Sequence, residues 1–257
     1  MTNPWLELNP ELLKLRSAAV LVVDSSGAQV FKKQIDNPMP IASITKLMTA
    51  MVILDSDLPL DQKITITKQD RDLVRLTGSR LKYGATLQRK EMLKLALMAS
   101  ENRAASALAR TFPGGTEAFV IAMNKKAKQL GMEQSHFSDP AGLQVENVAS
   151  ARDLVKLVTA ASNYPLIESA SGTRKLTVHP YAKRGPLIFG NTNRLLKNKA
   201  WDISVSKTGY INEAGRCLVM KAEVDGNELV FVLLNSFGKL TPYGDSNRIR
   251  KWIRQGT

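Results

Sequence analysis

Pro40-Ile-Ala-Ser-Ile-Thr-Lys-Leu-Met-Thr-Ala-Met51 is the stretch from which the fold and chemistry of this chain can be worked out. Pro38 and Pro40 interrupt the chain just before Ile41-Ala-Ser43, and apolar residues then recur at helical spacing until about Asp55. The pattern predicts a helix that begins near Ser43. Because Ser43 and Lys46 are three residues apart, they share one face of that helix. Taken alone, the pair is more typical of a helix-capping serine beside a solvated lysine.

Two further triplets give this pair a chemical meaning. Ser100-Glu-Asn102 interrupts a helical pattern that runs from Leu87 to Arg110, and it predicts a turn because Ser and Asn favour caps over helix interiors. Lys207-Thr-Gly209 ends a stretch rich in β-branched residues. Each triplet alone is typical of a capped loop or a strand end. In this order on one chain, the three motifs supply a nucleophile with a base, a proton-relaying hydroxyl with an amide, and a cationic strand edge.

Acyl transfer explains why these residue types occur together. A serine hydroxyl is a weak nucleophile until a base removes its proton, and Lys46 can be that base when its amine is uncharged. Burial lowers a lysine pKa, and so does a neighbouring cation such as Lys207. A helix N-terminus at Ser43 also favours a developing oxyanion. We expect Ser100 and Asn102 to face the same cleft, where the hydroxyl relays a proton and the amide orients Lys46.

Composition and isolated residues narrow the remaining classes. No apolar run among the 257 residues reaches the roughly 20 needed to cross a membrane. The net charge of +13 favours an anionic partner, but the basic residues are scattered and no nucleic-acid-binding motif is recognisable. Cys217 is the single cysteine and is expected to be buried. His136 and His179 fit no zinc motif, and no Gly-x-Ser-x-Gly segment supports a triad with Asp139. We therefore expect structural histidines, no metal and no cofactor.

Strands are predicted at both ends of the chain, with helices between them. An N-terminal β-hairpin over 18–33 turns at Asp24-Ser-Ser-Gly27. Further β-rich segments are expected over 202–208, 216–223 and 228–234. Helices are expected over 43–55, 87–110, 116–130, 150–161 and 243–254. This distribution predicts one antiparallel sheet built from both ends of the chain, with a helical insert.

With these motifs, the chain resembles the penicillin-binding DD-peptidases, the low-molecular-mass D-alanyl-D-alanine carboxypeptidases and endopeptidases of peptidase family S11. Residues 40–51 are similar to the active-site helix of that group. Asp139-Pro-Ala-Gly-Leu143 and Asn191-Thr-Asn-Arg-Leu-Leu196 resemble its connecting segments. Leu54-Asp-Ser-Asp-Leu-Pro-Leu-Asp61 is similar to an endopeptidase of the group. The resemblance covers nearly the whole chain.

The resemblance implies an α/β fold of the β-lactamase and transpeptidase type. Its central antiparallel sheet would have about five strands flanked by helices, with a helical subdomain beside it. For this chain we expect one catalytic domain over 1–257, with the sheet from about 17–36 and 200–257 and the helical subdomain over about 60–165. No second domain is expected after it.

The resemblance also implies roles for individual residues. The catalytic set would be Ser43, Lys46, Ser100, Asn102 and Lys207, and the substrate-binding set would be Lys207, Thr208, Gly209 and Tyr210. Ser43 would be acylated and Lys46 would be its base. The backbone N–H groups of Ser43 and Tyr210 would bind the oxyanion. Lys207 and Thr208 would hold a carboxylate of the substrate or of penicillin.

Three positions depart from the usual family pattern. Glu101 stands where Gly or Asp is frequent, and we expect its side chain to point outward. Tyr210 replaces a smaller residue or a histidine, and its bulk is expected to remodel the pocket for a terminal carboxylate. The chain ends at Thr257 without the β-rich domain and amphipathic anchor of many carboxypeptidases, and no signal peptide is visible after Met1. We expect a soluble, exported periplasmic enzyme.

These observations predict a serine DD-peptidase that cleaves D-alanyl bonds in peptidoglycan cross-bridges through a Ser43 acyl-enzyme, with β-lactam antibiotics as covalent inhibitors. The main alternative is a carboxypeptidase that removes terminal D-alanine. A β-lactamase is less well supported, because Glu133, Glu146 and Glu168 do not begin the Glu-x-x-Leu-Asn segment that activates water in class A enzymes. A catalytically silent wall-binding protein is a further alternative.

Overall fold

The computed structural model describes residue 5 and residues 7–256. Its helices and short 3-10 turns are η1 (Pro10–Leu12), η2 (Ala42–Ile44), α1 (Thr45–Leu54), η3 (Lys68–Asp70), α2 (Arg89–Met98), α3 (Asn102–Arg110), α4 (Gly115–Gln129), α5 (Ala151–Ala161), α6 (Pro165–Gly172), η4 (Arg194–Lys197) and α7 (Thr241–Gly256). Its strands are β1 (Ser17–Asp24), β2 (Gln29–Lys33), β3 (Met39–Pro40), β4 (Lys63–Thr65), β5 (Thr86–Gln88), β6 (Val148–Ala149), β7 (Lys175–Val178), β8 (Leu187–Gly190), β9 (Asp202–Ile211), β10 (Gly215–Val224) and β11 (Asn227–Ser236). Among these residues, no helix is both long and apolar enough to span a membrane.

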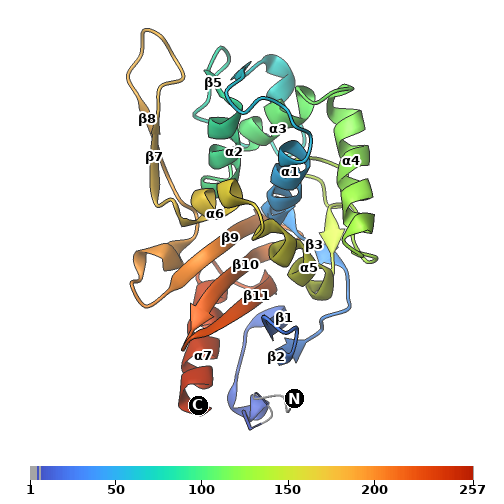
Figure 1. Ribbon diagram of the computed structural model, residues 1–257, viewed down its shortest axis with the longest axis vertical. Helices are drawn as coiled ribbons and strands as arrows, with labels where there is room; N and C mark the ends of the chain where they lie inside the picture. The colour runs from blue at the N-terminus through green and yellow to red at the C-terminus, as the bar shows by residue number, and fades with distance from the viewer. Residues whose placement is uncertain (1–4, 6, 257) are drawn as a thin grey trace.

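Five strands from the two ends of the chain form one antiparallel sheet in the order β2-β1-β11-β10-β9 (Figure 1). The central pairing joins β1 to β11, with Leu21 opposite Val232, although these residues lie far apart in sequence. The predicted sheet is therefore confirmed, including the turn at Asp225-Gly-Asn227, where Asp225 and Gly226 have positive φ angles of 49° and 73°. β9 lies at the edge of the sheet.

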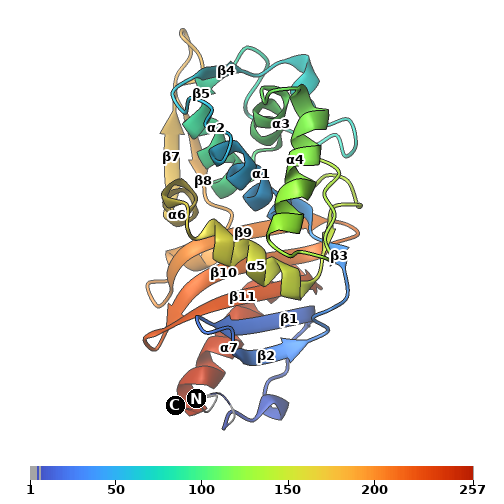
Figure 2. The same cartoon turned by 45° about the vertical axis from the view of Figure 1, so that its right-hand side comes forward.

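Alternating side chains on the strands supply two separate apolar cores. On β1, Leu21 faces the larger core and Val22 the smaller one. Figure 2 shows α5 across one face of the sheet and α7 behind the other. Trp252 of α7 also donates a hydrogen bond to the carbonyl oxygen of Asn9 at 2.9 Å. The result is three layers, as the family resemblance implies.

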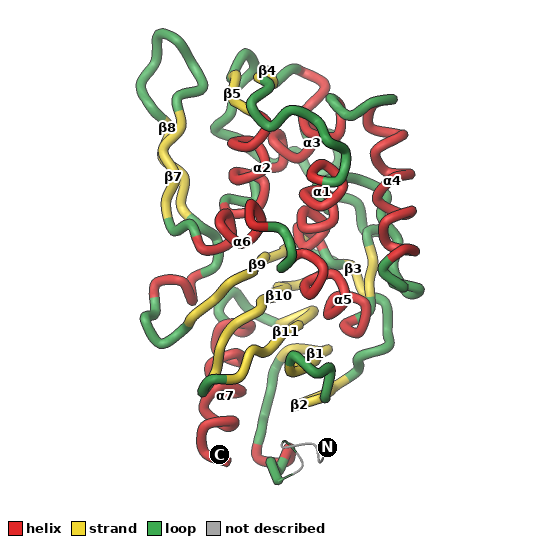
Figure 3. The backbone as a smooth tube through the Cα atoms, viewed as in Figure 1, coloured by secondary structure: helices red, strands yellow, loops and turns green. Residues whose placement is uncertain are grey.

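The remaining helices form a second body above one edge of the sheet (Figure 3). α1 lies at its centre, and every residue from Thr45 to Ile53 is buried. A helix that is buried on all sides joins two layers instead of covering one. Because α1 packs against α2, α3, α4 and α5, it fixes the helical body to the sheet.

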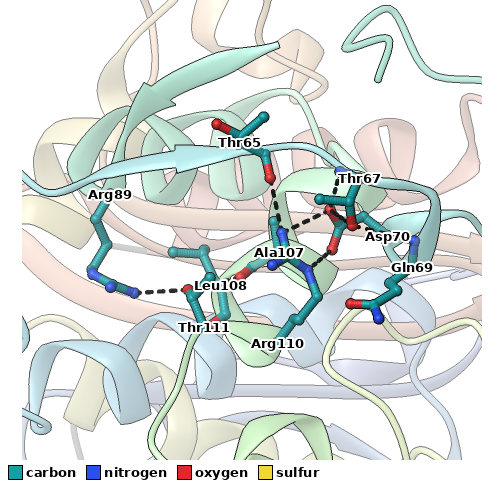
Figure 4. Close-up of polar contacts among 9 residues, drawn as sticks. All are labelled: Thr65, Thr67, Gln69, Asp70, Arg89, Ala107, Leu108, Arg110 and Thr111. Carbon is teal, nitrogen blue, oxygen red and sulfur yellow. Dashed lines mark hydrogen bonds and ion pairs between the residues drawn. The ribbon is translucent and has the colours of Figure 1, made fainter. Parts of the chain in front are cut away.

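A buried polar network holds the far end of α3 in place (Figure 4). Arg110 donates to both carboxylate oxygens of Asp70, at 2.8 and 3.0 Å, and to the carbonyl oxygen of Thr65 at 2.9 Å. Arg89 reaches the hydroxyl of Thr111 at 3.1 Å. Since α3 begins at the second sequence motif, this network helps to position that motif.

Most of the predicted elements are present, with small shifts at their ends. Ser150 caps α5 through its hydroxyl, and Gly131 ends α4 with a φ angle of +67°. Among the elements with no counterpart in the sequence predictions are α6 and the β7–β8 hairpin, which stands apart from the sheet in Figure 1. The short strands β3, β5 and β6 were not predicted either.

We expect Arg110→Met to lower the free energy of unfolding by about 2–4 kcal/mol, because it leaves the fully buried Asp70 carboxylate without its charged partner. Arg152→Met is the matched control, since its ion pair with Asp36 is solvent-exposed on both sides and should contribute less than about 1 kcal/mol. Urea denaturation of both variants measures the difference. Equal losses would contradict the role of the buried pair.

Candidate active site

Ser43 lies in the 3-10 turn that leads into α1, at the junction of the helical body and the sheet. Ala42, immediately before it, has a φ angle of +48°, which is unusual for a residue with a side chain. Gly142 packs so closely against this turn that a Cβ atom there would lie 1.9 Å from the Ala42 carbonyl oxygen. The backbone around Ser43 is therefore held by close packing.

Lys46 is completely buried and its amine touches three oxygen atoms. Its Nζ lies 2.7 Å from Ser43 Oγ, 2.7 Å from Asn102 Oδ1 and 2.6 Å from the carbonyl oxygen of Ala141. Burial lowers the pKa of Lys46 to about 7. The carboxylates of Asp139, Glu101 and Asp72 oppose this shift.

The three partners of Lys46 determine where its protons go. The carbonyl oxygens of Asn102 and Ala141 can only accept hydrogen bonds, whereas the Ser43 hydroxyl can also donate one. A neutral amine has two N–H bonds and one lone pair. The two N–H bonds satisfy the two carbonyl groups, so the lone pair is left for the Ser43 proton. This is the arrangement that a general base requires.

The second motif reaches the same cleft from the turn between α2 and α3. Ser100 has a φ angle of +57°, and Asn102 is the first residue of α3. The Asn102 amide makes two hydrogen bonds: its Nδ2 donates to Thr77 Oγ1 at 2.9 Å, and its oxygen accepts from Lys46. Ser100 Oγ accepts from Lys207 Nζ at 3.0 Å.

The third motif lies on the edge strand β9, and Lys207 is only 1% exposed. Burial, and in second place the charge of Lys46, lower the pKa of Lys207 well below its ordinary value. For Lys46 the pKa is lowered by burial, as predicted, whereas the predicted effect of the Lys207 charge is not among the causes. Gly209 packs closely against the Ser43 turn, because a Cβ atom there would lie 2.7 Å from Ile41 O and 3.3 Å from Ser43 N.

Asp139 builds the turn that carries the Ala141 carbonyl group, a role in the site that was not predicted from the sequence. Its two carboxylate oxygens accept backbone N–H bonds from the four residues Ala141 to Gln144, at 2.6–2.9 Å. Asn147 Nδ2 adds a fifth bond at 2.6 Å. The Asp-Pro-Ala-Gly segment was the available signal, because Asp followed by Pro and Gly marks a turn.

A cleft of about 680 Å³ contains Ser43, Ser100, Asn102 and the β9 edge. Tyr210 lines this cleft with 48% of its surface exposed, and Arg216 stacks on its ring at 3.6 Å. The hydroxyl groups of Thr208 and Thr192 lie 2.6 Å apart. All of the predicted catalytic and substrate-binding residues therefore meet in one place.

Predictions for other residues have mixed outcomes. The expectation that Glu101 points outward is wrong, because it is 9% exposed and its charge acts on Lys46. Cys217 is buried as expected, and burial raises the pKa of its thiol to about 11. His136 forms a β-bridge with Val148 on the outer side of the helical body.

Comparison with known proteins identifies the family of the chain. Residues 7–238 match the model of the peptidase S11 family, described as D-alanyl-D-alanine carboxypeptidase. The chain belongs to the peptidase S11 family. It is a serine D-Ala-D-Ala peptidase, in agreement with the resemblance seen in its motifs.

The sequences of relatives in this family align with nearly the whole chain. A D-alanyl-D-alanine endopeptidase of Pseudomonas aeruginosa is 46% identical over 95% of this chain and 79% of its own length. The corresponding endopeptidase of Escherichia coli is 43% identical over the same shares. The crystal structure of the DD-transpeptidase of Streptomyces K15 superposes with a TM-score of 0.85 at 26% identity, covering 93% of this chain and 97% of that one. The α/β fold of the transpeptidase type is thereby confirmed.

The pKa of Lys46 predicts how acylation depends on pH. Below about pH 7 the amine is protonated and has no lone pair for the Ser43 proton, so the acylation rate constant should rise with pH through an apparent pKa near 7. Rates of labelling by fluorescent penicillin between about pH 5 and pH 9 measure the profile. A rate that falls over this interval would contradict a neutral-amine base.

We expect Asp139→Asn to slow acylation by about tenfold or more, because an amide group would face backbone N–H donors and displace the Ala141 carbonyl from Lys46. Asp153→Asn is the control. Asp153 is also a buried carboxylate that accepts a backbone N–H bond, from Gln134 at 2.7 Å, but within residues 7–256 its carboxylate pairs with Gln134, Ser135 and Lys156 and not with Ala141 or Lys46. If both variants lose stability equally and acylate equally, Asp139 has only a structural role.

Proposed function

We propose that this protein is a DD-endopeptidase that cleaves D-alanyl bonds in peptidoglycan cross-bridges through a Ser43 acyl-enzyme. The proposal rests on one observation. The buried Lys46 amine contacts two oxygens that can only accept hydrogen bonds and one hydroxyl that can donate its proton. With its pKa lowered to about 7, the amine is neutral above that pH, and its lone pair is then available to activate Ser43.

Acylation begins when Ser43 Oγ adds to the D-alanyl carbonyl carbon and its proton moves to Lys46 Nζ. The carbonyl oxygen becomes an oxyanion, for which the backbone N–H groups of Ser43 and Tyr210 are the proposed donors. The C–N bond then breaks, and the leaving nitrogen takes the proton through the Ser100 hydroxyl. Lys46 returns to its neutral form. Asn102 orients the amine throughout, because its oxygen accepts from Lys46 at 2.7 Å.

Deacylation reverses these proton movements. Water adds to the ester carbonyl, gives its proton to Lys46, and the proton returns to Ser43 Oγ as the ester C–O bond breaks. A β-lactam ring would form the same ester at Ser43 by opening of its amide bond. We therefore propose β-lactam antibiotics as slowly released covalent inhibitors.

The edge strand β9 suits an extended peptide substrate. An edge strand offers unpaired backbone groups, so a stem peptide can lie along it as an added strand. Lys207 and Thr208 are placed to hold the carboxylate on the leaving side of the scissile bond. A bound carboxylate would also favour the charged form of Lys207, which opposes the effect of burial on its pKa.

Two features favour cross-bridges over terminal D-alanine as the substrate. The relatives at 46% and 43% identity are named endopeptidases. Tyr210 lines the cleft next to Thr208, and we propose that its ring restricts the space for a terminal carboxylate there. A carboxypeptidase is the alternative, because a Bacillus subtilis relative at 32% identity carries that name. Action on peptidoglycan also implies export, and we propose the periplasm as the location.

Digestion of purified cross-linked muropeptides tests the proposed activity. The enzyme should convert dimers to monomers, Ser43→Ala should abolish this, and Lys46→Ala should reduce it about a thousandfold or more. Mass analysis of the products distinguishes the two activities. Loss of terminal alanine from pentapeptides while dimers remain intact would favour the carboxypeptidase alternative.

A further inference from the structure

The active-site cleft extends well beyond the catalytic residues, and its outer part is strongly basic. Four of the side chains that line it are cationic and none is acidic. We call this group the cationic arm; it consists of Arg194, Lys197, Arg216 and Lys239. A cleft lined by charges of one sign concentrates ligands of the opposite sign.

The cations of this arm have no acidic partner among residues 5 and 7–256. None of them lies within 4.0 Å of a carboxylate oxygen there, although eight other ion pairs occur in the same part of the chain. Arg216 is held against the Tyr210 ring, and the other three are solvent-exposed. Their charges are therefore available to a ligand.

A rigid support holds Arg194 and Lys197 at the cleft. They begin and end the short turn η4, whose middle residues Leu195 and Leu196 are buried in the smaller core. Asn193 caps the turn by accepting from Leu195 N at 3.0 Å. The two cations are thus directed to the cleft side by the burial of their neighbours.

The cationic arm is directly connected to the proposed carboxylate site at Thr208. Thr208 Oγ1 lies 2.6 Å from Thr192 Oγ1, and Tyr243 donates to the Thr192 carbonyl oxygen at 3.1 Å. The charges of Arg194 and Arg216 both act on the Tyr243 phenol, where they oppose the burial that raises its pKa. Both cations line the same cleft as Thr208 and Tyr243, so a ligand bound at Thr208 shares the cleft with both charges.

The chemistry of the leaving group gives this arrangement a use. A terminal D-alanine leaves with one carboxylate, for which Lys207 and Thr208 suffice. The leaving group of a cross-bridge is a second stem peptide, which carries further carboxylates. We propose that the cationic arm binds these additional carboxylates and so selects a polyanionic leaving peptide. This inference rests on the proposed endopeptidase function.

The test compares Arg194→Gln/Lys197→Gln with wild type on two cross-linked dimers. One dimer is unmodified, and in the other the additional carboxylates of the leaving peptide are converted to amides. For each enzyme, kcat/KM for dimer cleavage is divided by the rate constant for acylation by fluorescent penicillin, which has no leaving stem peptide. The control variant is Lys183→Gln/Arg184→Gln, which removes the same charge from the β7–β8 hairpin and from residues that do not line the cleft.

We expect the ratio for the unmodified dimer to fall about tenfold in Arg194→Gln/Lys197→Gln and to stay within about twofold in the control. Amidation of the dimer should lower this ratio by a similar factor in wild type. In Arg194→Gln/Lys197→Gln it should lower the ratio little further, as required for charges that act on each other. If the ratio of Arg194→Gln/Lys197→Gln falls equally for both dimers, or does not fall, the inference is overturned while the endopeptidase proposal stands. If wild type leaves dimers intact, the endopeptidase proposal fails and the inference fails with it.

Discussion

The contact between the Lys46 amine and the Ser43 hydroxyl is the interaction on which the rest of this structure depends. Placing a lysine in a fully buried position is unfavourable unless its polar hydrogens are satisfied, and a charged amine there would cost far more than a neutral one. The oxygens of Asn102 and Ala141 satisfy the neutral form. The surrounding protein thus keeps a base available near neutral pH at the position where the nucleophile needs it.

Three separate parts of the chain must meet for this contact to form. The η2 turn and α1 provide Ser43 and Lys46, the first residue of α3 is Asn102, and the Asp139 turn provides the carbonyl of Ala141. Two of these parts have anchors of their own: the end of α3 is held by Arg110 and Asp70, and the turn by the hydrogen bonds to Asp139. Such supporting contacts fix the distances at the reacting atoms.

Local signals in the sequence account for much of the fold, and their absence accounts for what was missed. Ser150 and Gly131 mark helix ends through capping, and Asp225-Gly-Asn227 marks a hairpin through its positive φ angles. α6 is short and begins at Pro165, and its helical pattern is too brief to distinguish from a loop. Glu101 was predicted to point outward because nothing in the local sequence shows that the turn before α3 buries its side chain.

The sequence by itself determined the three motifs, their order, the antiparallel sheet and the residue types available for acyl transfer, because these follow from spacing and local chemical preference. Only the tertiary structure decided which proton acceptors surround Lys46, how far its pKa falls, and that Asp139 supports the site. The tertiary structure also brought Arg194 and Arg216 together in the cleft, from segments that precede and follow β9 in the sequence. Burial and contacts between distant segments arise only when the chain packs, so no local pattern encodes them.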